Sequence, residues 1–65
     1  MKFSEVVAQT LVWLQRDGRV SYRALKREFA LDDDFLEDVK AELIEAKRVA
    51  VDENGKVLEI GRAHV

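Results

Sequence analysis

The sequence predicts an α+β domain that is mainly helical, and three observations carry this prediction. Apolar residues recur at helical spacing in three successive segments between residues 3 and 47. A short extended link at 19–21 lies between the first segment and the second. Near the C-terminus, Asn54-Gly55 stands between two apolar-rich runs, which is the strongest short signal for a β-hairpin. Three helices followed by a hairpin are the elements of a winged helix-turn-helix, in which the hairpin is the wing.

The first helix is expected from Phe3 to Arg16. Ser4 is its expected N-cap, and Gly18 after Arg16 is a typical stop signal. Its apolar stripe is roughly 100° wide. The residues of this stripe are Phe3, Val6, Val7, Thr10, Leu11 and Leu14.

The second helix is expected at 22–29, with Ser21 as its N-cap. A turn at 30–32 then leads to a third helix, which begins at the acidic residues 32–34 and ends near Lys47. The apolar residues of these two helices are Tyr22, Leu25, Phe29, Phe35, Leu36, Val39, Leu43 and Ala46.

The hairpin is expected to turn at Asn54-Gly55, because a type I′ turn needs positive φ at both central positions. The expected pairs are Glu53 with Lys56, Val51 with Leu58 and Val49 with Ile60. An extended segment at 19–21 could add an edge strand. A three-helix bundle with a separate hairpin is the alternative, and it is disfavoured because a lone hairpin is marginal in water. The side chains expected to be buried are Phe3, Val7, Leu11, Leu14, Leu25, Phe29, Val39, Leu43, Val51 and Leu58.

The 65 residues allow one domain, expected at 1–61, followed by a tail or the start of a linker at 62–65. Hydrophobic residues make up 48% and charged residues 37%, as in a folded soluble chain. No apolar run approaches the roughly 18 residues of a transmembrane helix, so a cytoplasmic location is expected.

No catalytic, cofactor-binding or metal-ligating residue is assigned from the sequence. The chain has no cysteine, and its single histidine, His64, stands next to the C-terminus. Ser4 and Ser21 have no histidine nearby to activate them, and the glycines form no phosphate-binding pattern. The chain is therefore expected not to be an enzyme and to need no cofactor.

The third helix argues against specific DNA binding. In a DNA-reading winged helix this element enters the major groove. Residues 32–48 contain seven acids and three bases, a net charge of −4, and acids repel phosphate. No arginine, asparagine or glutamine stands early in this helix to contact a base edge.

Two sets of residues are candidates for contact with a partner. A basic face for an anion or an acidic partner is formed by Arg19, Arg23, Lys26 and Arg27. An apolar patch outside the helical stripes is formed by Val12, Trp13 and Ile44. The patch is expected to contact a second copy of the domain or a neighbouring domain. The alternatives are a solvated helix face for the first set and ordinary surface hydrophobicity for the second.

Four stretches carry a resemblance to a known family: VSYRALKREF at 20–29, LDD at 31–33, LEDVKAEL at 36–43 and AVDENGKVL at 50–58. Over residues 1–60 the chain resembles the short N-terminal segment of large bacterial signalling proteins. In those proteins the segment precedes a class III adenylate/guanylate cyclase domain, an AAA-type ATPase domain and helical repeats. The resemblance implies a non-catalytic accessory domain, and no catalytic residue of the cyclase or the ATPase is carried over.

The leading hypothesis is therefore a regulatory, protein-interaction winged helix in a multidomain nucleotide-signalling protein. A DNA-binding domain of a transcriptional regulator is the alternative that the fold alone suggests. A homodimerisation module is the third hypothesis.

Overall fold

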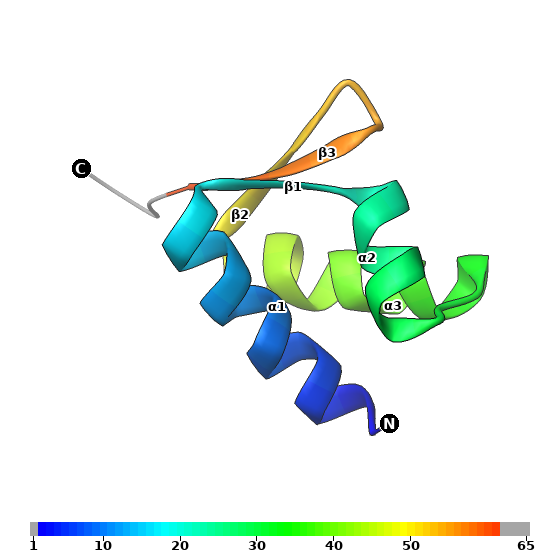
Figure 1. Cartoon of the computed structure of the whole chain (residues 1–65). Helices are drawn as coiled ribbons and strands as arrows, with labels where there is room; N and C mark the ends of the chain where they lie inside the picture. Colours follow the sequence, from blue (N-terminus) through cyan, green and yellow to red (C-terminus); the bar gives the residue numbers. More distant parts are fainter. Residues whose placement is uncertain (1, 62–65) are drawn as a thin grey trace.

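A computed structural model describes residues 2–61, and these form three helices and a three-stranded antiparallel sheet. The elements are α1 (Phe3–Asp17), β1 (Arg19–Ser21), α2 (Tyr22–Phe29), α3 (Asp33–Ala41), the π-helical turn η1 (Glu42–Ala46), β2 (Ala50–Glu53) and β3 (Val57–Ile60). Figure 1 shows α1 and α3 on one side of the sheet, with α2 beside the tip of the hairpin. The predicted winged-helix class is confirmed. The predicted tail at 62–65, with His64, lies outside the described residues.

The helix ends follow local chemistry in α2 and α3. The Ser21 hydroxyl accepts a hydrogen bond from the Ala24 N–H at 3.0 Å, as predicted for an N-cap. Asp32 caps α3 in the same way, through the Phe35 N–H at 2.8 Å. The predicted cap at Ser4 is wrong, because α1 begins at Phe3 and Ser4 lies inside its first turn.

The third helix changes period at its C-terminal end. Residues 42–46 form a π-helical turn, in which Lys47 N–H donates to the Glu42 carbonyl at 2.9 Å. A π-turn advances each residue by a smaller angle than an α-helix does. Ile44, predicted to lie outside the apolar stripes, is half-buried against the core, and Ala46, predicted on the apolar face of the helix, is exposed.

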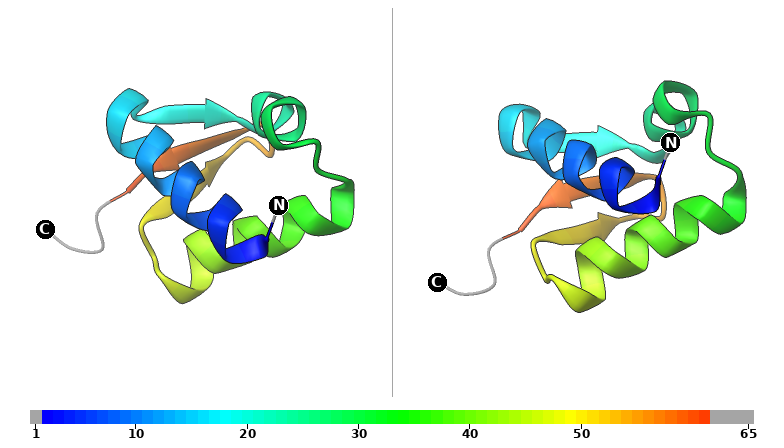
Figure 2. Two further views of the ribbon diagram at one scale, coloured as in Figure 1. Left: turned by 60° about the horizontal axis from the view of Figure 1, so that its bottom comes forward. Right: turned by 90° about the horizontal axis from the view of Figure 1, so that it is seen from below.

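The sheet has the strand order β1-β3-β2, so the predicted edge strand at 19–21 is confirmed. Figure 2 shows α1 and α3 covering one face of this sheet. The Ile60 N–H also bonds to the Gly18 carbonyl at 2.8 Å, which extends the contact between β3 and the entry to β1. The central strand β3 is thus held on both sides.

The predicted hairpin register is wrong by one residue. The observed partners are Ala50 with Ile60, Val51 with Glu59, Asp52 with Leu58 and Glu53 with Val57. Positive φ at Asn54 and Gly55 was predicted correctly. The Lys56 N–H donates to the Glu53 carbonyl at 3.1 Å and closes the turn, but strand pairing begins one residue later, with Glu53 opposite Val57.

A one-residue shift exchanges the two faces of a strand. Ala50 is therefore buried and Val51, predicted to be buried, is 48% exposed. Phe3 was also predicted to be buried but is 38% exposed at the end of α1, where its ring packs on Phe35 at 5.8 Å. Leu11 and Phe29 are half-buried.

The core lies between the sheet and the helices. Its buried apolar residues are Val6, Val7, Leu14, Val20, Tyr22, Leu25, Leu31, Leu36, Val39, Leu43, Ala50 and Leu58. Six of the residues predicted to be buried are among them: Val7, Leu14, Leu25, Val39, Leu43 and Leu58. No helix among residues 2–61 is long and apolar enough to cross a membrane.

We predict that Ala30→Gly stabilises the domain by about 0.5–1 kcal/mol. Ala30 ends α2 with φ 55°, where a Cβ is strained and glycine is not. Thermal or urea unfolding measures the change. Ala24→Gly inside α2 is the control and should destabilise the domain by about 1 kcal/mol. Equal losses in both variants would contradict this account of the helix end.

We predict that Gly55→Val destabilises the domain by about 1–3 kcal/mol, because a β-branched residue is strained at positive φ. Gly55 has φ 70° in the hairpin turn. Gly55→Asn should cost less, because asparagine tolerates this region. An unchanged melting temperature for the valine variant would contradict the turn geometry.

Candidate functional site

A groove lies between α2, α3 and the tip of the hairpin, and we call it the basic groove. It is lined by Ser21, Tyr22, Arg23, Lys26, Arg27, Leu36, Glu37, Lys40, Gly55, Lys56 and Val57, and its volume is about 820 Å³. Five of these residues are cations and one is an acid, which gives a net charge of +4. The whole chain carries −2, so the rest of it carries −6. Charge is therefore strongly segregated over the molecule.

The cations reach the groove from three elements. Arg23, Lys26 and Arg27 share one face of α2, because they stand at positions i, i+3 and i+4 of a helix. Lys40 comes from the last turn of α3, and Lys56 from the hairpin loop. The three elements meet only in the folded chain.

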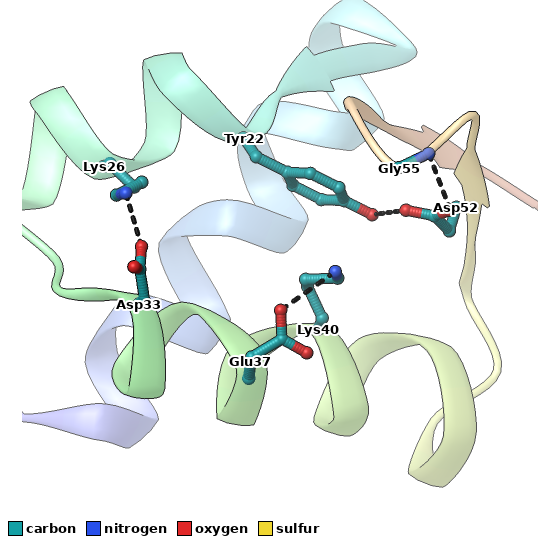
Figure 3. A network of polar contacts seen from close by, with 7 residues as sticks. All are labelled: Tyr22, Lys26, Asp33, Glu37, Lys40, Asp52 and Gly55. Carbon is teal, nitrogen blue, oxygen red and sulfur yellow. Dashed lines mark hydrogen bonds and ion pairs between the residues drawn. The ribbon is translucent and has the colours of Figure 1, made fainter.

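Two of the five cations are held by acids. Lys26 Nζ lies 2.6 Å from Asp33 Oδ1, which links α2 to α3, and Lys40 Nζ lies 3.2 Å from Glu37 Oε2 (Figure 3). The other three, Arg23, Arg27 and Lys56, are exposed and form no ion pair within residues 2–61. They are available to an anionic partner.

Tyr22 fixes the hairpin tip against α2. Its hydroxyl points from α2 to Asp52 on β2 and donates a hydrogen bond to that carboxylate (Figure 3). Its backbone N–H donates to the Lys56 carbonyl, and Asp52 Oδ2 also accepts the Gly55 N–H at 3.0 Å. These bonds hold Lys56 at the rim of the groove.

Lys40, on α3, contacts the ring of Tyr22. Its Nζ lies 4.5 Å from the centre of the Tyr22 ring, a cation–π distance. Tyr22 is buried, and its ring, its hydroxyl and its backbone N–H all have partners within the domain. Contacts within the domain therefore hold this wall of the groove.

The electrostatics of Tyr22 and Asp52 agree with this geometry. Burial, and then the hydrogen bond to Asp52, raise the pKa of the Tyr22 phenol, which therefore stays a donor. The hydrogen bond from Tyr22 lowers the pKa of the Asp52 carboxyl, with smaller help from the Gly55 N–H and Lys40. Asp52 is thus ionised under ordinary conditions and accepts both bonds.

The predicted basic face is only partly reproduced in the groove. Arg23, Lys26 and Arg27 line it, but Arg19 does not, because its guanidinium pairs with Glu53 on β2. Lys40 and Lys56 were not predicted. Neither had a local signal, since each is brought to α2 by packing between elements distant in the sequence.

The three residues of the predicted apolar patch do not line one common depression. Val12, 62% exposed, and Trp13 line a depression between α1 and the end of α2. There Trp13 packs edge-on against Phe29 at 6.4 Å, and its indole N–H donates to Asp17 at 2.8 Å. Ile44 packs against the core and does not line this depression. A contact with a partner at Val12 and Trp13 stays a prediction.

Residues 2–61 give little support for a metal site or for a phosphate-binding surface on α3. No three His, Cys, Asp or Glu side chains there are grouped to hold a metal ion. The solvent-facing side of α3 presents the exposed carboxylates Asp34 and Asp38, which would repel a phosphate backbone. Among residues 2–61, the basic groove is the surface best suited to an anionic ligand.

Comparisons of this chain with protein-family models, curated proteins and solved structures give no match. The resemblance to the N-terminal segment of cyclase-containing signalling proteins therefore stays a prediction.

We predict that Tyr22→Phe raises the pKa of Asp52 toward its ordinary value, which is about 3.9 in an unfolded chain. The lowered pKa means that the ionised acceptor stabilises the fold above that value, and this contribution is lost as pH falls through the folded pKa. The stability difference between wild type and Tyr22→Phe should therefore be largest near neutral pH and shrink in acid. Carboxyl NMR titration and unfolding at several pH values measure both effects. An Asp52 pKa that is the same in both proteins would show that Tyr22 does not act on it.

Proposed function

We propose that this chain is a non-catalytic, protein-interaction domain that docks through the basic groove onto an acidic segment of a protein. The observation that carries the proposal is the net +4 lining of a groove in a chain of net charge −2. Complementary charge accelerates encounter and selects partners. Arginine suits this task, because its planar fork binds a carboxylate through two hydrogen bonds.

The lining of the groove supports an acidic ligand. Its cations stand on α2, α3 and the hairpin tip, while the buried side chains of Leu36 and Tyr22 contribute to its lining. An acidic segment that lies along the groove can place its carboxylates opposite Arg23, Arg27 and Lys56. The pairing leaves no buried charge without a partner, because these three cations are exposed.

Nucleic acid is the second candidate, and the same cations favour it. Lys56 stands at the tip of the wing and Lys40 on α3, where DNA-binding winged helices approach the duplex. Against this stand Asp34 and Asp38 on the exposed side of α3, because a DNA-reading winged helix inserts this helix into the major groove, where these acids would repel phosphate. The balance of charge on α3 favours an acidic protein segment.

The proposal also includes the kind of protein to which the domain belongs. By its resemblance to the N-terminal segment of cyclase-containing signalling proteins, the domain is regulatory and cytoplasmic. The acidic segment then belongs to a neighbouring domain or to a second protein. Fold alone does not decide between these roles, so binding at the groove has to be measured.

The test is an NMR titration of the labelled domain with a short poly-glutamate peptide at low salt. We expect shift changes confined to the groove, and binding weakened at least tenfold from about 50 to about 300 mM NaCl. The triple variant Arg23→Gln, Arg27→Gln, Lys56→Gln should lose binding. The charge-matched control Arg16→Gln, Lys47→Gln, Arg48→Gln, whose positions lie outside the groove, should retain it.

Duplex DNA is the competing ligand in the same titration. We expect no binding tighter than roughly 10⁻⁵ M at about 100 mM salt, and no dependence on sequence. Nanomolar, sequence-dependent binding would replace the proposal with a DNA-binding function. Equal poly-glutamate binding by the groove variant and the control would also contradict it.

A further inference from the structure

An acidic stripe runs along the solvent-facing side of α3 and η1. Asp34 and Asp38 stand at i and i+4 of α3, and Glu45 continues the stripe in η1. All three are exposed and form no ion pair within residues 2–61. Three neighbouring acids of the same segment are already engaged: Asp33 by Lys26, Glu37 by Lys40, and Asp32 as the α3 cap. The stripe is therefore a free anionic surface of this same chain.

Small side chains lie beside the acids of the stripe and leave room for another chain. Two alanines, Ala41 and Ala46, lie beside its acids and are exposed, so another chain can approach the backbone of α3 and η1 closely. Asp38, Ala41, Glu45 and Ala46 line one shallow depression together with Glu42 and Phe3. The lining of this depression and the lining of the basic groove share no residue. The two surfaces are therefore formed by separate sets of residues of one chain.

The free cations of the groove repeat the spacing of the stripe. Arg23 and Arg27 stand at i and i+4 of α2, as Asp34 and Asp38 do on α3. Side chains at this spacing are about 5–6 Å apart along a helix. Two arginine forks can thus face two carboxylates when α2 of one molecule lies along α3 of another. Lys56 then stands at the rim of the groove as a third cation for the acidic partner.

We propose that the acidic segment bound by the basic groove is the acidic stripe of a second copy of this chain. This inference rests on the proposed function, and it adds the identity of the partner. Charge complementarity carries it: a groove of net +4 and a remainder of net −6 belong to one chain, and their free charges have matching spacing. The contact joins two different surfaces, so it is heterologous.

The test is the self-association of the full chain, measured by sedimentation at rising protein concentration. We expect the average mass of the wild type to rise at about 50 mM NaCl and to return to the monomer at about 300 mM. The groove variant Arg23→Gln, Arg27→Gln and the stripe variant Asp34→Asn, Asp38→Asn should each associate at least tenfold more weakly. The control Arg16→Gln, Arg48→Gln removes the same charge outside the groove and should behave as the wild type.

Mixing the two variants gives the decisive result. The groove variant keeps an intact stripe and the stripe variant keeps an intact groove, so an equimolar mixture should form a 1:1 complex. With the stripe variant labelled, amide shifts should appear at Arg23, Arg27 and Lys56. A mixture that stays monomeric would overturn the inference.

The proposed function can survive or fail separately. A wild type that stays monomeric but still binds poly-glutamate at the groove would overturn the second copy as partner and leave the interaction function standing. A wild type that binds poly-glutamate nowhere would overturn both. Self-association that persists in both variants would place the contact on another surface and overturn the inference.

Discussion

Tyr22 attaches the hairpin tip to α2, and the geometry of the groove follows from this attachment. Its N–H donates to the Lys56 carbonyl, which continues the pairing of β1 with β3, and its hydroxyl donates to the Asp52 carboxylate. A helix must find partners for its first N–H groups, and here the loop of the hairpin supplies one. Together the two bonds hold the hairpin loop on α2 and place the Lys56 cation at the rim of the groove.

The register has consequences on both sides of the sheet. Ala50 faces the core, where a small side chain fits beneath the sheet, and Val51 faces outward. Asp52 shares its face with the buried Leu58, at the end of the strand where Tyr22 can reach it. The same shift therefore sets the packing of the core and the position of the carboxylate that holds the wing.

Charge segregation follows from how the helices are arranged. Along α2, Arg23 and Arg27 form a cationic edge, and along α3, Asp34 and Asp38 form an anionic one. The helices are linked between these edges by Lys26 and Asp33, which neutralise each other. A domain with a small core can thus present two surfaces of opposite charge without burying an unpaired ion.

Periodicity and capping chemistry predict the three helices, the N-cap at Ser21, the turn at Asn54-Gly55 and the basic face of α2 from the sequence. Each of these features depends on residues within a few positions of one another. Packing between distant segments sets four other features: the hairpin register, the burial of Ala50 instead of Val51, the half-burial of Ile44, and the placement of Lys40 and Lys56 at the groove. A shift of one residue in the pairing of two strands exchanges their faces without changing the local sequence pattern, so the sequence predicts the hairpin but not its register.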